Sequence, residues 1–391
     1  MPGRIARSPE DALRATLTRI ARATVDDETL DPAALALDAG NWSALADVAE
    51  RHQLAPLASA CLSAYRDAVP PATMCRLDAL ILRERAWRRA RSTALAEILD
   101  ALDRSSIAPL VLKGAALAWM IYPSPDLRPM SDVDLLVPRE AASAAADALA
   151  AIGFRRTPAS SRPSPSGRHH LPALMRSGPL PLHVELHVDA IDADARSSIT
   201  TETLRSPPQA FVMDGLTALT LGVRDMLRHL AQHVLQPSWD GRVRLLGVVD
   251  LYRYAAMCVA RADWPSIARD EPFVMNTLRC LHYVIPLPAT LAAIGPPPHW
   301  PTPARAGETL WPLRAIATHE DRIEGLRNLV FDPPAWWLHA YYGVPLDRPL
   351  RGVRLWRHPR RVAHWLTRRA IERWMPSKDE SAISAESRQA S

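Results

Sequence analysis

The sequence predicts an α+β fold in which a small mixed β-sheet is flanked by N-terminal and C-terminal helical regions. Apolar residues recur every three or four positions over the first hundred residues, which is typical of helices. Short apolar runs separated by Pro- and Gly-containing turns follow, and helical spacing returns from about Leu216. These changes divide the chain into helical region 1–104, core 105–215, helical region 216–292, irregular and helical region 293–376, and disordered tail 377–391.

The composition indicates a soluble chain with more than one core. Its 391 residues suffice for two or three domains. Hydrophobic residues make up 48% and charged residues 23%, and no window holds the roughly 18 consecutive apolar residues of a membrane span. The segment Met1–Arg7 lacks the apolar stretch of a secretory signal. We therefore expect a cytoplasmic protein without a transmembrane segment.

Net charge and cysteine content exclude few classes of function. A net charge of +5 suits a nucleotide, a nucleic acid or an anionic surface without choosing among them. The cysteines stand singly in apolar helical patterns, with no CxxC pair and no histidine at zinc-ligand spacing. They are predicted to be buried thiols: Cys61, Cys75, Cys258 and Cys280.

Apolar spacing, proline and glycine predict the helices and strands of the first helical region and of the core. Prolines at Val69–Pro71 end a helix, and a long arginine-rich helix with a solvated face is predicted from Thr73 to Asp103. The core is then predicted to contain, in order, a strand at 109–112, a helix from Gly114 to Tyr122, a loop at 123–129, a strand at 133–137, a helix at 139–152 ended by Gly153, a strand beginning at Phe154, and an antiparallel pair at 171–175 and 182–188.

Two carboxylates at the start of a predicted strand are the principal candidates for chemistry. Residues two apart in a strand point to the same face, so Asp132 and Asp134 would project together from Cα atoms about 6.6 Å apart. Two carboxylates this close repel unless a cation lies between them. The pair is therefore predicted to bind metal, in the arrangement that clamps two Mg²⁺ ions for phosphoryl transfer.

Cationic residues and a helix N-terminus near this pair indicate a phosphate ligand. Lys113 and Gly114 lie where a predicted strand meets a helix, and backbone amides at a helix N-terminus can bind phosphate. Arg128, four residues before Asp132, could bind the same anion with two parallel hydrogen bonds. The alternatives are a solvated strand end for Lys113 and a loop salt bridge for Arg128.

Four segments together resemble the uncharacterised bacterial nucleotidyltransferase family of the polymerase-β-like superfamily. They are Leu112–Leu117, Tyr122–Pro123, Arg128–Val137 and Glu185–His187, and the likeness extends loosely from Asn41 to Leu251. The resemblance implies Mg²⁺, or alternatively Mn²⁺, and a nucleoside triphosphate. It implies transfer of a nucleoside monophosphate to a hydroxyl of an unidentified acceptor (protein, RNA or small molecule), with release of pyrophosphate.

The resemblance also implies a third carboxylate on a later strand, for which Glu185 is the candidate. His183 and His187 share its strand face and are candidate substrate contacts. The superfamily glycine is normally followed by serine and lies about a dozen residues before the first aspartate. Here Ala115 follows Gly114, and Asp132 lies 18 positions after the glycine.

Two other motifs carry further predictions. His229 and His233 lie one helical turn apart, but without a glutamate between them and a third ligand they do not form a zinc site. The segment 357–375 predicts a basic amphipathic helix that either docks on the protein or contacts an anionic surface or nucleic acid.

Two other functions remain open from the sequence. A sugar-nucleotide glycosyltransferase also uses a DxD motif, but its fold requires an α/β half before the motif, where this chain is predicted to be helical. A noncatalytic binding or regulatory protein that keeps the fold would be consistent with the missing serine.

Overall fold

A computed structural model describes residues 9–35, 37–156, 169–191, 198–235, 244–259, 264–294, 333 and 335–374. The predicted disordered tail at 377–391 lies outside these residues. The chain begins with helices, as predicted. They are α1 (Pro9–Asp26), the 3-10 helix η1 (Pro32–Leu35), α2 (Ala39–Arg51), α3 (Ala55–Leu62), the 3-10 helix η2 (Ser63–Ala68) and the long α4 (Pro71–Arg104).

The helix boundaries have local causes. Asp38 caps α2 by accepting a hydrogen bond from the backbone amide of Asn41 at 2.7 Å. Both α3 and α4 have proline in their first turn, where the missing amide proton costs nothing. The arginine-rich face of α4 is mostly exposed, but Arg91 is buried and pairs with Glu84 at 2.7 Å.

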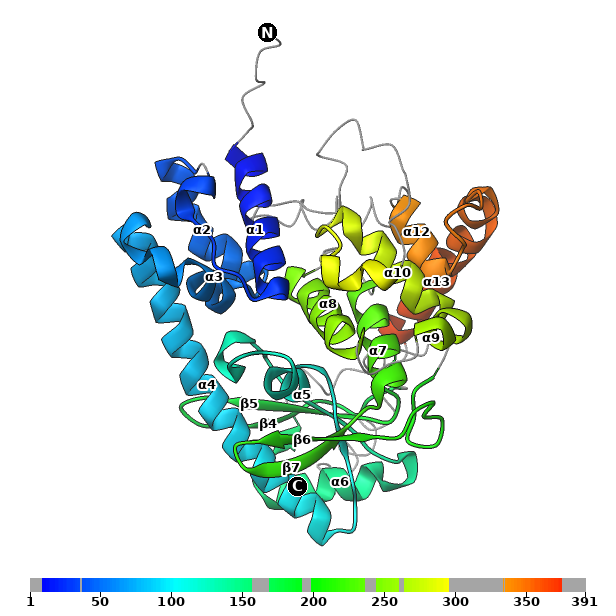
Figure 1. The fold of residues 1–391 in the computed structure, drawn as a ribbon. Coiled ribbons are helices and arrows are strands. Elements are labelled where there is room, and N and C mark those ends of the chain that lie inside the picture. Colours follow the sequence, from blue (N-terminus) through cyan, green and yellow to red (C-terminus); the bar gives the residue numbers. More distant parts are fainter. Residues whose placement is uncertain are drawn as a thin grey trace.

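Seven strands form one mixed sheet in the order β3-β4-β5-β2-β1-β7-β6, visible in the lower half of Figure 1. Two neighbouring pairs, β2 with β5 and β1 with β7, are parallel, and the other pairs are antiparallel. The strands are β1 (Leu110–Val111), β2 (Val133–Leu136), β3 (Arg155–Arg156), β4 (Leu174–Arg176), β5 (Leu182–His187), β6 (Gln209–Met213) and β7 (Leu216–Thr220).

Short helices connect the strands of the core. They are α5 (Lys113–Met120), the 3-10 helices η3 (Pro125–Leu127) and η4 (Arg139–Ala141), and α6 (Ala142–Ala151). Gly153 has φ +93°, the left-handed conformation expected of a glycine that ends a helix. The predicted antiparallel pair around Gly178 is confirmed as β4 and β5.

The two faces of the central strands differ in chemistry. In β5, Val184 and Leu186 pack into an apolar cluster with α4 and α6, whereas the alternate residues Glu185 and His187 point to the opposite face. In β2, Val133 and Leu135 join the same cluster, and Asp134 points away from it. The period of two therefore concentrates polar side chains on one face of β2 and β5.

The sheet extends further along the chain than predicted. Helix was expected from Leu216, but Leu216–Thr220 forms β7, which pairs with β6 and, in parallel, with β1. Asp214 and Gly215 have φ of +46° and +86° and form the tight turn of this hairpin. Alternating buried Ala218 and Thr220 fit a strand, and helix α7 begins at Val223.

Helices after the sheet pack with the N-terminal helices in a second, larger apolar core, in the upper half of Figure 1. No described helix is long and apolar enough to cross a membrane. The elements are α7 (Val223–Leu235), α8 (Leu245–Val259), α9 (Trp264–Asp270), α10 (Pro272–Cys280), the 3-10 helices η6 (Leu281–Tyr283) and η7 (Ala289–Ile294), α12 (Ala335–Tyr342), the π-helical turn η8 (Val353–Arg357) and α13 (His358–Trp374).

The predictions for the cysteines and for the C-terminal helix can be compared with this arrangement. Cys61 and Cys280 are buried as predicted, but Cys75 is exposed because it lies on the solvent side of α4. The basic C-terminal helix is docked at its start, where His358 is buried and its Nδ1 lies 3.0 Å from the Tyr342 hydroxyl. Leu355 and Trp356, just before it, are exposed.

Candidate active site

The polar face of β2 and β5 brings the predicted carboxylates together. Asp134 in β2 lies directly opposite Glu185 in the parallel register of the two strands. Asp132 lies two residues before Asp134, immediately ahead of β2. Asp134 is buried, whereas Asp132 and Glu185 are partly exposed. The register thus places Glu185, separated from Asp134 by 51 positions in the sequence, beside the first two carboxylates.

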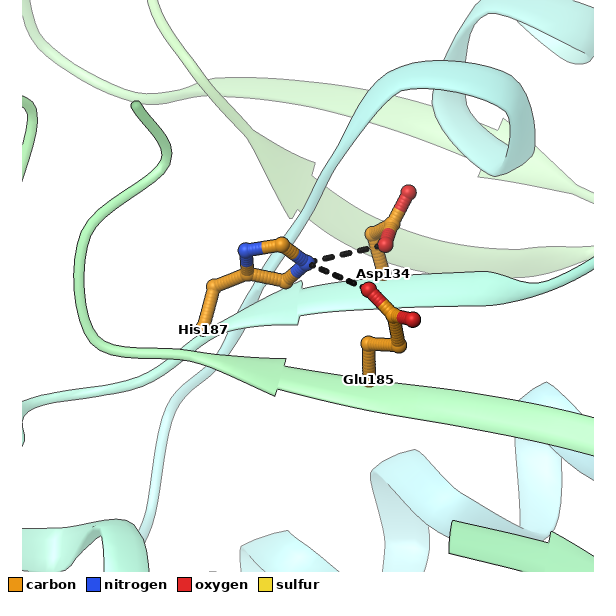
Figure 2. A group of neighbouring side chains, drawn as sticks. All are labelled: Asp134, Glu185 and His187. Carbon is orange, nitrogen blue, oxygen red and sulfur yellow. Dashed lines mark hydrogen bonds and ion pairs between the residues drawn. The ribbon is translucent and has the colours of Figure 1, made fainter. Parts of the chain in front are cut away.

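His187 connects two of these carboxylates. Its Nε2 lies 2.9 Å from Asp134 Oδ1 and 3.5 Å from Glu185 Oε2, as Figure 2 shows. The ring is 3% exposed and contacts the rings of His169 and His170, with centroids 5.8 and 5.4 Å away. His183, the other histidine of this strand face, is partly exposed and lies opposite Met175 of β4.

Lys113 supplies the positive charge next to Asp134. Its Nζ lies 3.3 Å from Asp134 Oδ2, and its side chain is 20% exposed. Lys113 is the first residue of α5 and has φ +41°, a left-handed conformation uncommon outside glycine. No side chain caps this helix N-terminus. The N-cap residue is Leu112, whose apolar side chain cannot accept a hydrogen bond from the backbone amides of the first turn.

The environments of the carboxylates differ. Burial raises the pKa of Asp134, but the charge of Lys113 and the hydrogen bond with His187 outweigh it and hold this pKa well below its usual range. Burial and the charge of Asp134 raise the pKa of Asp132. The hydrogen bond with His187 lowers the pKa of Glu185 against the effect of burial. Of these three carboxylates, Asp134 is therefore the one whose negative charge the folded protein stabilises most.

Arg128, predicted to contact the triphosphate or to form a loop salt bridge, is paired within the protein. Its Nε and Nη2 bind Asp250 of α8 at 3.0 and 2.6 Å, and Tyr122 donates a hydrogen bond to the same carboxylate at 2.5 Å. The guanidinium packs beneath Gly114, where an added Cβ would lie 2.3 Å from Nη1. The loop salt bridge, the alternative left open by the sequence, is therefore what the structure contains.

The surroundings of several residues near the site could not be predicted from the sequence. Asp250 lies 122 positions after its partner Arg128. His229 of α7 is 2% exposed, and its Nε2 has no hydrogen-bond partner within the described part of the chain. Burial, followed by the charge of Lys113, lowers the pKa of His229 well below its ordinary value. The spacing of His229 and His233 predicted only that they share a helix face, and their rings are stacked at 6.4 Å.

The side chains around β2 and β5 fit a divalent cation. Ligand atoms of Asp134, Glu185 and His187 all lie within 4.8 Å of one another. Two carboxylates and an imidazole are ordinary ligands of divalent cations. Asp132 lies outside this group of three but is close enough for its charge to act on Lys113.

Comparison with known proteins identifies the family of the chain. The family model described as "Uncharacterised nucleotidyltransferase" matches residues 38–291, which is more than half of the chain. Neither the curated proteins nor the solved structures gave a match. The matched region runs from α2 to η7 and contains the whole sheet with Asp132, Asp134 and Glu185. The chain therefore belongs to the uncharacterised nucleotidyltransferase family.

Proposed function

We propose that this protein is a metal-dependent nucleotidyltransferase that moves a nucleoside monophosphate from a nucleoside triphosphate to a hydroxyl of a protein, an RNA or a small molecule. The observation that supports it most is the register that sets Glu185 beside Asp134, with Asp132 two residues away and Lys113 in contact. Family membership supports nucleotidyl transfer in general.

Each residue has a defined part in the proposed reaction. Lys113 and the uncapped N-terminus of α5 bind the triphosphate anion. The acceptor oxygen forms a bond to the α-phosphorus while the bond from that phosphorus to the bridging oxygen of pyrophosphate breaks. The hydroxyl proton passes to a carboxylate, and Glu185 is better suited than Asp134, whose negative charge is already compensated by Lys113 and His187.

Asp132, Asp134 and Glu185 are the proposed protein ligands of Mg²⁺ or Mn²⁺. A divalent cation held there supplies charge neutralisation to the triphosphate, which is the main requirement of phosphoryl transfer. Three oxygen ligands on one face of the sheet fit this use. Arg128 serves instead to position the loop before Asp132, through its ion pair with Asp250.

The arrangement upstream of the motif disfavours a glycosyltransferase. Four α-helices, α1 to α4, precede β1, so an α/β nucleotide-binding half is absent from the described residues before Asp132. An experiment distinguishes the proposed enzyme from the other alternative, a noncatalytic binding or regulatory protein.

The decisive experiment is incubation of the protein with each of the four α-³²P-labelled nucleoside triphosphates, Mg²⁺ or Mn²⁺, and cell extract. We expect one triphosphate to transfer its label to a macromolecule or metabolite that can then be identified. Asp132→Asn is the matched control, since it removes one proposed ligand and is expected to abolish labelling. Triphosphate binding by calorimetry without any labelling would instead support the noncatalytic alternative.

A further inference from the structure

His187 is held where a metal ligand would be. It follows Glu185 by two residues in β5, so both side chains leave the strand on the face that also carries Asp134. Its Nε2 faces both carboxylates, at 2.9 Å from Asp134 Oδ1 and 3.5 Å from Glu185 Oε2 (Figure 2). The nitrogen and the two carboxylates thus converge on one point.

The ring is also restrained in this orientation. It is 3% exposed and contacts the rings of His169 and His170. Nδ1 has no hydrogen-bond partner within the described part of the chain, whereas Nε2 has two carboxylate neighbours. Nε2 is therefore the nitrogen available for coordination, and a buried ring needs little reorganisation to use it.

An imidazole changes which cations such a site prefers. Mg²⁺ takes oxygen ligands in a strict octahedron and keeps several of its waters. Imidazole suits transition metals, and affinity for a site that contains nitrogen rises along the first-row series from Mn²⁺. A site with Asp134 and Glu185 alone would accept Mg²⁺ readily, and a third ligand from His187 shifts the preference away from it.

We propose that His187 is a direct metal ligand through Nε2, together with Asp134 and Glu185, and that the site therefore prefers a divalent transition metal, with Mn²⁺ as the representative, over Mg²⁺. The inference rests on the proposed function in one respect only, that this site holds a divalent cation. Asp132, the further ligand proposed above, lies outside these three converging groups.

The test measures coordination directly, without turnover. Mn²⁺ is titrated into the full-length protein, and binding is followed by loss of the free-ion electron paramagnetic resonance signal. Electron spin echo envelope modulation then reports histidine nitrogen bound to Mn²⁺. We expect ¹⁴N modulation in the wild type, and its loss in His187→Gln with Mn²⁺ binding weakened at least about 10-fold. Mg²⁺, measured by competition, should be affected less.

His183→Gln is the matched control, because His183 lies on the same strand face at the same distance in sequence from Glu185 but outside the converging group. It should keep the nitrogen modulation and bind Mn²⁺ within about 2-fold of the wild type. If His187→Gln does not fold, the wild-type spectrum still tests the proposal. Absence of histidine ¹⁴N modulation from the Mn²⁺-bound wild-type protein overturns it. Modulation or affinity retained in a folded His187→Gln also overturns it.

The two proposals fail in different ways. Absence of histidine coordination alongside metal-dependent label transfer would leave the nucleotidyltransferase proposal intact and remove His187 from the ligand set. Histidine coordination of Mn²⁺ without label transfer from any triphosphate would leave the coordination proposal intact and count against the enzymatic function.

Discussion

At the scale of single residues, the two aspartates of the DxD motif are not equivalent. Asp134 is buried between Lys113 and His187, which together hold its pKa well below the usual range despite burial. For Asp132, burial and the charge of Asp134 outweigh the charge of Lys113 and raise the pKa. The folded protein therefore favours the charge of Asp134 and disfavours that of Asp132.

Substitution of the two aspartates should therefore separate stability from activity. Asp132→Asn and Asp134→Asn are both expected to abolish transfer. Asp134→Asn should also lower the free energy of unfolding by about 2–3 kcal/mol, because it leaves Lys113 and His187 without their counter-charge, and Lys113 is partly exposed. Asp132→Asn should leave that free energy unchanged or raise it. Urea unfolding of both variants beside the wild type checks this, and equal losses would contradict it.

Glu185→Gln is expected to separate binding from chemistry. The nearly isosteric variant should keep triphosphate affinity through Lys113 and lose turnover by about 10²-fold or more if Glu185 accepts the acceptor proton. The carboxylate of Asp189, another acidic residue on this segment, already accepts hydrogen bonds from the backbone amides of Ile191 and Ile199 at 3.0 and 2.9 Å. Affinity and transfer rate should be measured on one preparation, with Glu140→Gln as the control; near-normal turnover would exclude this role.

His229 predicts a dependence of stability on pH. Its pKa in the folded protein lies well below the ordinary value, first through burial and then through the charge of Lys113. The unfolded chain therefore takes up the proton more readily, and stability contributed by neutral His229 is lost as pH falls below about 6.5. The loss should grow as the pH falls from about 6.5 to 5. His229→Leu should lose less stability than the wild type between pH 7.5 and 5 in urea unfolding; parallel losses would refute the assignment.

At the scale of elements, the loop between α5 and β2 is fixed from two sides. Arg88 of α4 binds Asp126 at 2.6 Å, and the backbone of Met130 hydrogen-bonds to Glu84 of the same helix. On the other side, Arg128 binds Asp250 of α8. The loop that precedes the DxD strand is therefore held by α4 on one side and by α8 on the other.

This anchoring changes what Arg128→Ala should do. Loss of one partner of a buried ion pair leaves the other unpaired, so Arg128→Ala should lower the free energy of unfolding by about 3–5 kcal/mol and affect triphosphate affinity only secondarily. Asp250→Ala should cost a similar amount. The double variant should cost clearly less than the sum. Urea unfolding of all four proteins gives the coupling, and strictly additive losses would contradict the pair.

At the scale of the whole molecule, α8 contacts both the loop before Asp132 and the end of helix α1. Asp250 binds Arg128, and one turn later Arg253 donates a hydrogen bond to the carbonyl of Ile121 at 2.7 Å and another to Asp27 at 2.6 Å. Helix α1, which lies outside the region matched by the family model, buries Leu17 and Ile20 in the same apolar core. Contacts of α8 thus link helix α1 to the loop before Asp132.

Deletion of residues 1–37 should therefore destabilise the matched region although it removes none of it. The deletion exposes the apolar surface that α1 covers on α3 and α8, and we expect a lower melting temperature or an insoluble chain. Leu17→Ala in the full chain is the graded control, at a cost of about 2–5 kcal/mol for a side chain 1% exposed. An unchanged melting temperature in the truncated chain would contradict this prediction and show that the matched region does not depend on α1 for its stability.

The sequence alone determined the elements whose signals are local. The strands β1, β2, β4 and β5, the helix N-terminus at Lys113 and the end of α6 at Gly153 were all readable, because apolar period, proline and glycine act on the backbone within a few residues. The alternation in β5 likewise predicted that His183, Glu185 and His187 share a face. The hairpin of β6 and β7 was missed, because its exposed apolar residues Val212, Leu216 and Leu219 blur the alternation.

Only the tertiary structure decided how the charges are paired. The register of β2 and β5 set Glu185 beside Asp134, and the packing of α8 paired Arg128 with Asp250. It also separated Asp134 from Asp132, which look alike in the motif. The physical reason is that a charge's environment is fixed by burial and by partners tens or hundreds of positions away, and no local pattern encodes those distances.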